Sequence, residues 1–480
     1  MLITDERQFP SETIRDILEK ISRKGVRKMR IVIIGDGKVG FKLAKQLSEE
    51  DYDIVLVDNN EKKLKAAIDK LDIFCVAGDG ASADVQKEAG VSQADLVIAC
   101  ASTDEFNMLA CLIARKLGAK HTIARVRNPI YHRQIDLLKE DLRLSMVVNP
   151  EWIVSQEISR LLIFPDVSKI ETFVKGKVEL IELPLLEDNP LVGLSLKEMY
   201  IKYKIKLLVC AVEREEQVVI PDGDFVMQAG DHLHISASHE ELERFFKLLK
   251  RKRKIRNVLI AGGGKVSFYL AKQLLSLGMQ VKIIELNEEK CEDLCEMLPK
   301  ATIIHGDATD HDLLLEEGIN QADAFIALTG MDEENIILSF FAKKQGVQKI
   351  IVKVNEDRRM KLISDDFGLD CVVSAKTVTA DAIISYVRAR HNSQGSANVE
   401  TMYRLIDGKV EALEFAVRSE TSYTQIPLKE LKLKPGNLIA CIARNRNIII
   451  PNGDDCIQEG DNVVVITMES RIQDILDIIR

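Results

Sequence analysis

The sequence of 480 residues has no apolar run close to the roughly 18 residues that a membrane-spanning helix needs, so we expect any membrane role to come through a partner. Its start, with Asp5, Glu6 and Arg7, lacks the apolar core of a secretory signal. Positive charge is not in excess: the net charge of −9 makes general nucleic-acid binding a poor fit. A composition of 46% hydrophobic and 29% charged residues excludes disordered and collagen-like classes.

Disulfide and catalytic patterns are also missing. The nine cysteines are an odd number, and several lie in apolar runs such as Val97–Cys100, so we expect reduced thiols in the cytosol. We find no Walker lysine motif for ATP hydrolysis and no helix-turn-helix. The length predicts several domains, at about 100–200 residues each.

An internal duplication organises the chain. Ile31-Val-Ile-Ile-Gly-Asp-Gly-Lys-Val-Gly40 returns 227 residues later as Val258-Leu-Ile-Ala-Gly-Gly-Gly-Lys-Val-Ser267. Further matches at nearly the same spacing are Asp104–Asn107 with Asp332–Asn335 and Ile220–Asp224 with Ile450–Asp454. Such a steady spacing predicts two tandem units of one design.

Each unit is predicted to have two parts. Apolar runs such as Ile31–Ile34 and Ile54–Val57 alternate with helical spacing, which predicts a Rossmann-like doubly wound parallel sheet. Short alternating strands and Gly-Asp turns follow, and each half ends in an amphipathic helix, at Glu240–Leu249 and around Ile472–Ile479. The fold class is therefore α/β, each Rossmann-like sheet being followed by a small α+β domain. The predicted domains are nucleotide-binding domains at 30–150 and 255–375 and small C-terminal regulatory domains at 165–249 and 396–480.

Residues 1–29 form an N-terminal extension. Ile14, Ile17, Leu18 and Ile21 have the spacing of an amphipathic helix, and a basic run follows, as it does at Lys250–Lys254. This pattern indicates the closing helix and linker of a small domain without the rest of that domain. The alternative is a non-native or misread start upstream of Met29.

A glycine loop begins each half. Gly35-x-Gly37-x-x-Gly40 follows a strand and opens a helix, which is the setting in which such a loop binds a pyrophosphate. Asp58 ends the second strand, and an acid there accepts hydrogen bonds from the adenosine ribose and repels a 2′-phosphate. NAD(H), ATP and ADP fit this pattern, and NADP does not. In the second half Ser267 takes the third glycine position and Glu285 takes the acidic position.

Further polar residues follow the later strands. Arg125, or Lys353 in the second half, could reach phosphate oxygens, whereas for Thr103 and Thr329 helix capping is the favoured interpretation. For Gly78-Asp79 and Gly306-Asp307 ligand contact and a strand-ending turn are left as alternatives. The predicted cofactor-binding residues are Gly35, Asp36, Gly37, Lys38, Val39, Gly40, Asp58, Gly78, Asp79, Thr103, Asn107 and Arg125, and then Gly262, Gly263, Gly264, Lys265, Val266, Ser267, Glu285, Gly306, Asp307, Thr329, Asn335 and Lys353.

No catalytic or metal site is predicted. A dehydrogenase needs a proton-transfer group beside the nicotinamide, and the small domains offer no such constellation. His232 and His234 would share a strand face, with His239 near. Because the second half has Asn462 and Val464 at those positions, we favour a solvated strand face over a metal pair.

The whole pattern resembles the RCK (KTN) domain family, and the tandem order over residues 30–480 is similar to the TrkA-type regulatory subunits of Trk/Ktr potassium uptake systems. The resemblance is carried by Gly35–Gly40, Asp58, Gly78-Asp79, Thr103–Asn107 and Ala124–Pro129. The departures are the N-terminal extension, Ser267, Met331 and Lys353, so the equivalence of the two sites stays open.

The resemblance implies a cytosolic regulatory subunit, not an enzyme, that lies peripherally at the inner face of the cell membrane. It implies binding of NAD(H), with ATP or ADP as further ligands, and no nucleic acid. It also implies a ring built from a homo-oligomer, expected to be a tetramer, that controls a TrkH/TrkG-like integral membrane subunit translocating potassium. The alternative functions are a soluble NAD-dependent oxidoreductase and a redox-sensing repressor.

Overall fold

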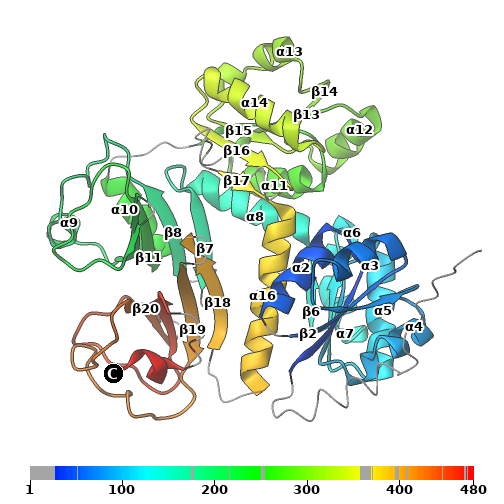
Figure 1. Ribbon diagram of the computed structural model, residues 1–480. Helices are drawn as coiled ribbons and strands as arrows, with labels where there is room; N and C mark the ends of the chain where they lie inside the picture. Colours follow the sequence, from blue (N-terminus) through cyan, green and yellow to red (C-terminus); the bar gives the residue numbers. More distant parts are fainter. Residues whose placement is uncertain are drawn as a thin grey trace, which may run out of the picture. The chain divides into compact units, whose positions relative to one another are not determined.

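Two parallel sheets form the framework of the chain (Figure 1). The computed structural model describes residues 28–50, 52–173, 178–215, 217–249, 255–356, 369, 371–394, 399–406, 409–445, 447–469, 472 and 474–480. The amphipathic helix expected within 1–29 falls in residues 1–27, outside the described residues.

The first parallel sheet has the strand order β3-β2-β1-β4-β5-β6, which is the doubly wound order. Its strands are β1 (Arg30–Ile34), β2 (Asp53–Asp58), β3 (Phe74–Ala77), β4 (Leu96–Ala99), β5 (His121–Arg125) and β6 (Met146–Val148). Its helices are α2 (Lys38–Glu49), α3 (Glu61–Ile68), α4 (Ala83–Glu88), η1 (Val91–Gln93), α5 (Asp104–Leu117), α6 (Pro129–Arg133) and α7 (Ile135–Asp141).

The second parallel sheet repeats this order as β14-β13-β12-β15-β16-β17. Its strands are β12 (Asn257–Ala261), β13 (Gln280–Glu285), β14 (Thr302–His305), β15 (Ala324–Ala327), β16 (Lys349–Lys353) and β17 (Val372–Val373). Its helices are α11 (Lys265–Ser276), α12 (Glu288–Met297), α13 (His311–Glu316), η2 (Ile319–Gln321) and α14 (Asp332–Lys344). The predicted α/β class with a repeated Rossmann-like sheet is confirmed.

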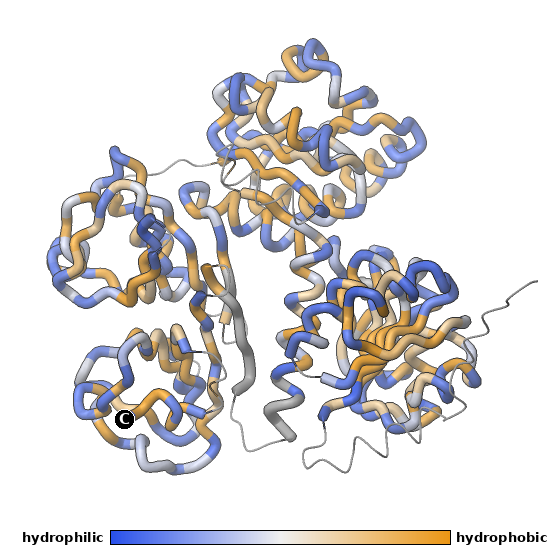
Figure 2. The backbone as a smooth tube through the Cα atoms, in the orientation of Figure 1, coloured by the Kyte–Doolittle hydropathy of each residue, from blue (hydrophilic) through white to orange (hydrophobic). Residues whose placement is uncertain are grey.

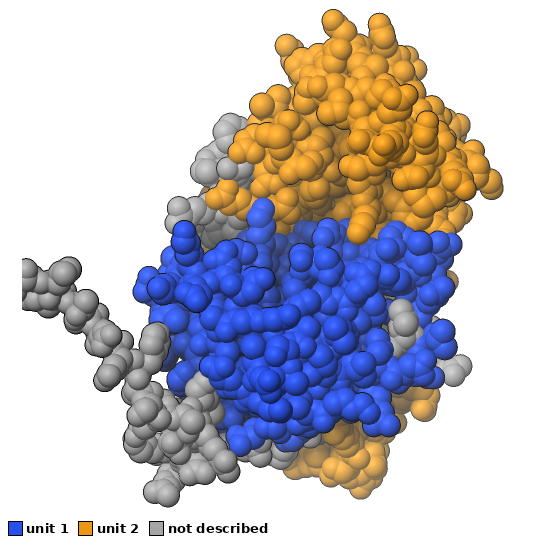
Figure 3. All heavy atoms as spheres, turned by 90° about the vertical axis from the view of Figure 1, so that its right-hand side faces the viewer, with its two compact units in different colours: residues 1–151, 375–384 blue, residues 152–374, 385–480 orange. Residues whose placement is uncertain are grey.

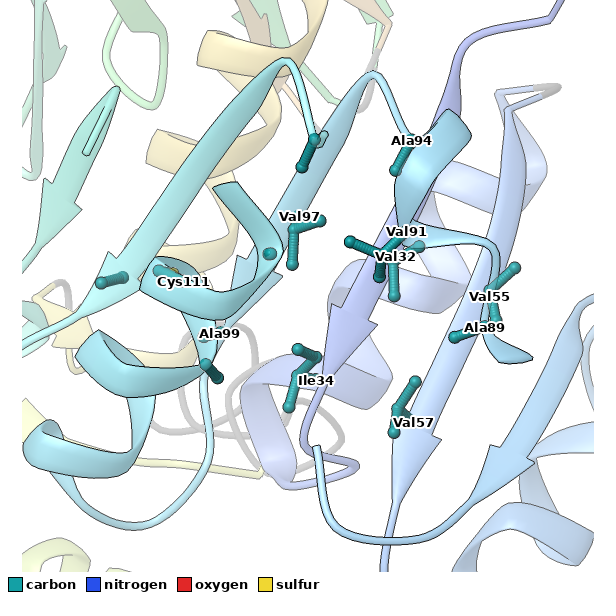
Figure 4. Packing of buried hydrophobic residues seen from close by; sticks show 14 of the residues in the cluster. Val32, Ile34, Val55, Val57, Ala89, Val91, Ala94, Val97, Ala99 and Cys111 are labelled. Atoms are coloured by element: carbon teal, nitrogen blue, oxygen red, sulfur yellow. The ribbon is translucent and has the colours of Figure 1, made fainter. Parts of the chain in front are cut away.

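Burial on both faces explains why the central strands are continuous apolar runs. Val32 and Ile34 of β1 pack with Val55 and Val57 of β2 and with Val97 of β4 in one cluster (Figure 4). The opposite face of β1, including Ile31 and Ile33, is also buried, so the apolar run Ile31–Ile34 is covered on both faces. The interior strands accordingly stand out as apolar along the backbone (Figure 2).

The chain divides into two compact units whose boundaries cut across the repeats (Figure 3). The first unit holds the described residues up to Glu151 together with Ala375–Ile384, the start of α16 (Ala375–Gln394). The second holds Trp152–Ser374 and Ser385–Arg480, and so takes most of α8 (Pro150–Ile163). The first sheet is thus grouped with the first part of α16, which follows the second sheet, and the second sheet with most of α8, which follows the first.

Matching contacts fix these exchanged helices. In the first unit Lys42 Nζ on α2 donates to Thr377 Oγ1 on α16 at 2.7 Å. In the second unit Gln273 Nε2 on α11 donates to Ser155 Oγ on α8 at 2.8 Å.

Two antiparallel sheets follow the parallel ones, in the orders β10-β9-β11-β8-β7 and β18-β19-β22-β20-β21. The elements of the first are β7 (Lys169–Phe173), β8 (Val178–Pro184), α9 (Leu196–Tyr203), β9 (Leu208–Arg214), β10 (Gln217–Val219), β11 (His232–Ser238) and α10 (His239–Leu248). Those of the second are β18 (Val399–Leu405), β19 (Val410–Ala416), β20 (Asn437–Arg444), β21 (Asn447–Ile449), β22 (Asn462–Thr467) and η4 (Ile475–Ile478). One apolar cluster contains side chains of both sheets, among them Leu180, Cys210, Ala412 and Ile466.

The closing helix expected around Ile472–Ile479 is wrong in extent. Only a 3₁₀ turn forms at Ile475–Ile478, where Asp474 makes a capping box. The turn ends at Ile479, whose backbone is extended and pairs with Leu433 in an isolated β-bridge.

An ion pair between a partly exposed arginine and a fully buried aspartate stabilises the Gly-Asp turn of each small sheet. Arg214 donates to both carboxylate oxygens of Asp231, at 2.6 and 2.7 Å, and Asp231 also accepts the N–H of Gln228 at 2.8 Å. Arg444 and Asp461 repeat the pair. Among the described residues, no helix combines the length and apolarity needed to cross a membrane.

We expect Asp231→Ala to destabilise the small domain by about 1–3 kcal/mol, because the carboxylate is fully buried and its removal leaves Arg214 Nε and the Gln228 N–H without their acceptor. The measurement is the midpoint of thermal unfolding. Lys197→Ala is the matched control, since it breaks an ion pair with Asp224 in which both partners are exposed. An equal shift in both variants would contradict the prediction.

Candidate nucleotide-binding sites

The first glycine of each loop is required by its backbone conformation. Gly35 has φ +105° and Gly262 has φ +99°, in the left-handed region that glycine alone adopts readily. A Cβ on Gly35 would also lie 2.9 Å from the Ala101 backbone. Both glycines donate their N–H to the end of the neighbouring strand, Gly35 to the Val57 carbonyl at 2.7 Å and Gly262 to that of Ile284 at 2.8 Å.

The glycine just before each helix, Gly37 in the first loop and Gly264 in the second, leaves room for a ligand. No atom lies within 4 Å of a Cβ built on Gly37 or on Gly264, and both residues are N-caps, of α2 and α11, that make no side-chain capping bond. Neither helix has an acid in its first turn; Lys38 and Lys265 stand there instead, and Val39 and Val266 are buried. The free N–H groups and the positive helix end therefore suit an anion.

The third glycine position of the loop motif is Gly40 in the first repeat and Ser267 in the second. In both repeats a side chain donates a hydrogen bond to the carbonyl of the first glycine of the loop. A Cβ on Gly40 would lie 1.9 Å from the Gly35 oxygen, and the Cys100 thiol donates to that oxygen at 3.5 Å. In the second loop Ser267 is buried and its hydroxyl donates to the Gly262 carbonyl. Sequence reasoning missed Cys100, which is a core residue with no motif of its own.

The strand-end acids hold the loops in place. One oxygen of Asp58 accepts the N–H of Asp36 at 2.7 Å, and the other accepts that of Asn60 at 2.8 Å. Glu285 accepts the N–H of Gly263 at 2.6 Å and that of Asn287 at 3.0 Å. The extra methylene of Glu285 is thus accommodated without loss of either backbone contact.

Asp36 and Gly263 mark the sharpest difference between the two loops. The Asp36 side chain is only 7% exposed. Burial and the charge of Asp58 raise the pKa of Asp36, and Lys63 partly opposes them. At Gly263 a Cβ would meet Leu294 at 2.7 Å and the Glu285 side chain at 2.9 Å, so no side chain fits.

The Gly-Asp pairs form turns after the third strands. Gly78 has φ +155°, and its N–H donates to the Asp58 carbonyl, as that of Gly306 donates to the Glu285 carbonyl. Asp79 accepts the N–H of Ala81 at 2.9 Å. Asp307 accepts both the N–H and the hydroxyl of Thr309 at 2.8 Å.

Two buried asparagines shape the loops after the fourth strands. Asn107 accepts the Ala101 N–H at 2.8 Å and donates to the Arg125 carbonyl at 2.9 Å. Asn335 makes the same pair of contacts with Thr329 and Lys353. Each amide therefore connects the loop after the fourth strand to the end of the fifth strand.

The capping role expected for the two threonines is wrong. Thr103 is the N-cap of α5 but makes no side-chain capping bond, and its side chain is exposed. Thr329 lies before the α14 N-cap, Met331, and its hydroxyl closes a turn with Met331.

Arg125 and Lys353 end the fifth strands of the two sheets. Arg125 Nη2 donates to the Ala101 carbonyl, whereas its buried Nε has no partner in the described part of the chain. Burial lowers the pKa of Arg125, a sign of the cost of holding this charge away from water. Lys353 Nζ donates to the Leu328 carbonyl at 3.2 Å. An incoming phosphate oxygen would satisfy the orphaned donor of Arg125.

The solvated strand face expected for His232 and His234 is wrong for His234. That residue is 4% exposed, and burial lowers its pKa to about 4. His232 is half-exposed and bonds through Nδ1 to Glu182 at 2.8 Å. No group of three or more His, Cys, Asp or Glu able to hold a metal ion occurs among the described residues.

Paired glycine loops on doubly wound sheets, each sheet with a small antiparallel domain after it, define a class of tandem Rossmann-type proteins. The TrkA-N domain family matches residues 31–150 and 258–375, and the TrkA-C domain family matches residues 180–250 and 412–480. The chain belongs to the TrkA family of tandem RCK proteins, as the sequence predicted.

Curated relatives match almost end to end. The Trk system potassium uptake protein TrkA of Haemophilus influenzae is 33% identical, covering 91% of this chain and 95% of the relative. The TrkA homolog of Archaeoglobus fulgidus is 33% identical, covering 94% of this chain and all of the relative.

Solved structures support the fold alone, because their identity is low. The GsuK channel bound to NAD has a TM-score of 0.62 at 19% identity and covers 94% of this chain and 80% of its own. The GsuK RCK domain has a TM-score of 0.61 at 19% identity and covers 93% of this chain and 96% of its own.

Gly37→Ala and Gly40→Ala should separate binding from stability. At Gly37 the new methyl enters open space, so stability should hold while nucleotide affinity falls. At Gly40 the methyl collides with the Gly35 carbonyl, which should cost about 1–3 kcal/mol of stability. Thermal unfolding and NADH titration of both variants make the comparison, and a destabilised Gly37→Ala with unchanged affinity would refute it.

Stability should depend on pH through Asp36. Because its folded-state pKa is raised above the ordinary value of about 3.9, this carboxyl contributes stability that is present below that value and is lost as pH rises through the folded-state pKa. Asp36→Asn removes this dependence, so its gain in thermal midpoint over the wild type should grow from acidic to neutral pH. A gain independent of pH would contradict the assignment.

Proposed function

We propose that this chain is the nucleotide-binding regulatory subunit of a Trk-type potassium uptake system. In this proposal it binds NAD(H), with ATP or ADP as alternatives, and controls a TrkH/TrkG-like membrane subunit that translocates potassium. It acts as a homo-oligomer, a tetramer, at the inner face of the membrane. The names and near-complete coverage of the TrkA relatives support the potassium system.

The observation that carries nucleotide binding is the paired, uncapped helix start behind an open glycine. At α2 and α11 the second glycine leaves free space, the first helical turn has no acid, and a carboxylate fixes the loop. Helices α3 and α12 are instead capped by asparagine side chains, and α4, α5 and α14, which also lack a side-chain capping bond, have acids in their first turn. An anionic ligand at α2 and α11 would take the place of such caps.

A regulatory role fits these sites better than redox catalysis. The small domains bring no proton-transfer group and cofactor pocket together in the described residues, and catalysis of hydride transfer depends on that pairing. A ligand that binds two assembly states with different affinity shifts their balance, typically by about 1–3 kcal/mol per site. Turnover of NADH with a small carbonyl substrate would favour the oxidoreductase instead.

Binding should weaken when either strand-end acid is removed. Asp58→Ala is expected to lose about 1–3 kcal/mol of NADH affinity at the first site, because both the ribose contact and the grip on the loop are lost. The measurement is titration calorimetry on the full chain. Asp53→Asn, at the opposite end of β2 where Asp53 pairs with Arg30, is the matched control and should bind normally. Unchanged NADH affinity in Asp58→Ala would show that Asp58 does not bind the ribose at the first site.

Transport is the direct test of the proposed function. Expressed in cells that lack their own TrkA subunit, the chain should restore potassium uptake, and the Gly37→Glu, Gly264→Glu double variant should not. Light scattering on the purified chain should show a tetramer. A monomer at micromolar concentration, or full uptake with both loops blocked, would exclude nucleotide gating by a ring.

A further inference from the structure

The first site contains a second carboxylate that the second site lacks. The Asp36 backbone N–H lies against the Asp58 carboxylate, and the Asp36 side chain is buried next to it. Among the described residues the Asp36 carboxylate accepts no hydrogen bond, and the charge of Lys63 only partly offsets its repulsion from Asp58. Two acids thus lie side by side where the ribose end of a dinucleotide would bind.

The neighbouring helix explains why only the first repeat has this pair. Asn60 caps α3 and Asn287 caps α12, so Ala67 of α3 corresponds to Leu294 of α12. Leu294 fills the space in which a side chain at position 263 would lie, whereas the equivalent residue of α3 is the smaller, fully buried Ala67 and position 36 carries a buried aspartate. The smaller residue on the helix thus goes with the larger residue in the loop: Ala67 with Asp36 in the first repeat, and Leu294 with Gly263 in the second.

We propose that Asp36 confines the first site to ligands with a free ribose 2′-hydroxyl, independently of Asp58. The inference rests on the nucleotide-binding function proposed above and concerns which dinucleotides the first site accepts. A 2′-phosphate placed at Asp58 would face a second buried anion, and repulsion at short range in a partly dry site is large. The second site excludes such ligands through Glu285 alone.

A distinguishing consequence follows for the usual charge reversal at the ribose contact. An arginine placed at position 58 would lie beside the Asp36 carboxylate, and a guanidinium binds a carboxylate through two parallel hydrogen bonds. In that ion pair the arginine would no longer be available to bind a 2′-phosphate. An arginine at position 285 meets no such competitor, because residue 263 is glycine.

The test uses the full chain with one site blocked at a time. Gly264→Glu blocks the second site and Gly37→Glu blocks the first, since both positions open into free space and tolerate a side chain. With the second site blocked, NADH and NADPH are titrated by calorimetry into Asp58→Arg and into Asp36→Asn with Asp58→Arg. With the first site blocked, Glu285→Arg is the matched control. Asp36→Gly, which copies the second repeat, serves if the asparagine variant does not fold.

We expect Asp58→Arg alone to stay within about threefold of its parent for NADPH, and the double variant to gain about tenfold or more. Glu285→Arg should gain a similar factor without any second change. Equal NADPH gains in Asp58→Arg and in the double variant, or no gain in a folded double variant, would overturn the role of Asp36. Absence of NADH binding in the Gly264→Glu parent would instead overturn nucleotide binding at the first site, on which the inference rests.

Discussion

The grip of a strand-end carboxylate on the backbone of the glycine loop is the interaction on which each nucleotide site depends. Asp58 and Glu285 both span from the second residue of the loop to the start of the following helix. In the loop held this way the first glycine has a left-handed conformation, and the helix that follows the loop, α2 or α11, begins without a capping side chain. The open start of α2 or α11 thus follows a loop that is held by the neighbouring strand.

The two repeats keep this arrangement while exchanging the side chains around it. The carbonyl of the first glycine takes a thiol from Cys100 in one repeat and a hydroxyl from Ser267 in the other. The residue after the first glycine is the buried Asp36 in the first repeat and, in the second, Gly263, where a Cβ would meet Leu294. Each substitution is matched by a change in a residue distant in sequence, so the repeats share backbone geometry but differ in the charge presented to a ligand.

The exchange of helices links the repeats beyond their sequence order. Thr377 on α16 contacts α2 of the first sheet, and Ser155 on α8 contacts α11 of the second. Within the second unit, Lys349 on β16 is buried and donates to the carbonyls of Pro165 and Val167, where the chain enters the first small sheet. The second parallel sheet is therefore in direct contact with the segment that leads into the first small domain.

The sequence by itself determined the duplication, the alternation of strands and helices, both glycine loops and the acids that follow them, because these depend on local spacing and backbone conformation. It also indicated the family. Only the tertiary structure decided which side chains meet across strands. The Asn107 and Asn335 side chains bond to the backbone at the ends of the fifth strands, and Thr103 makes no side-chain capping bond. His234 is buried, and the expected last helix is a single turn that ends at Ile479, which pairs with Leu433. Those outcomes depend on contacts between residues far apart in the chain, such as Cys100 with Gly35, and the spacing of residues along a sequence carries no information about them.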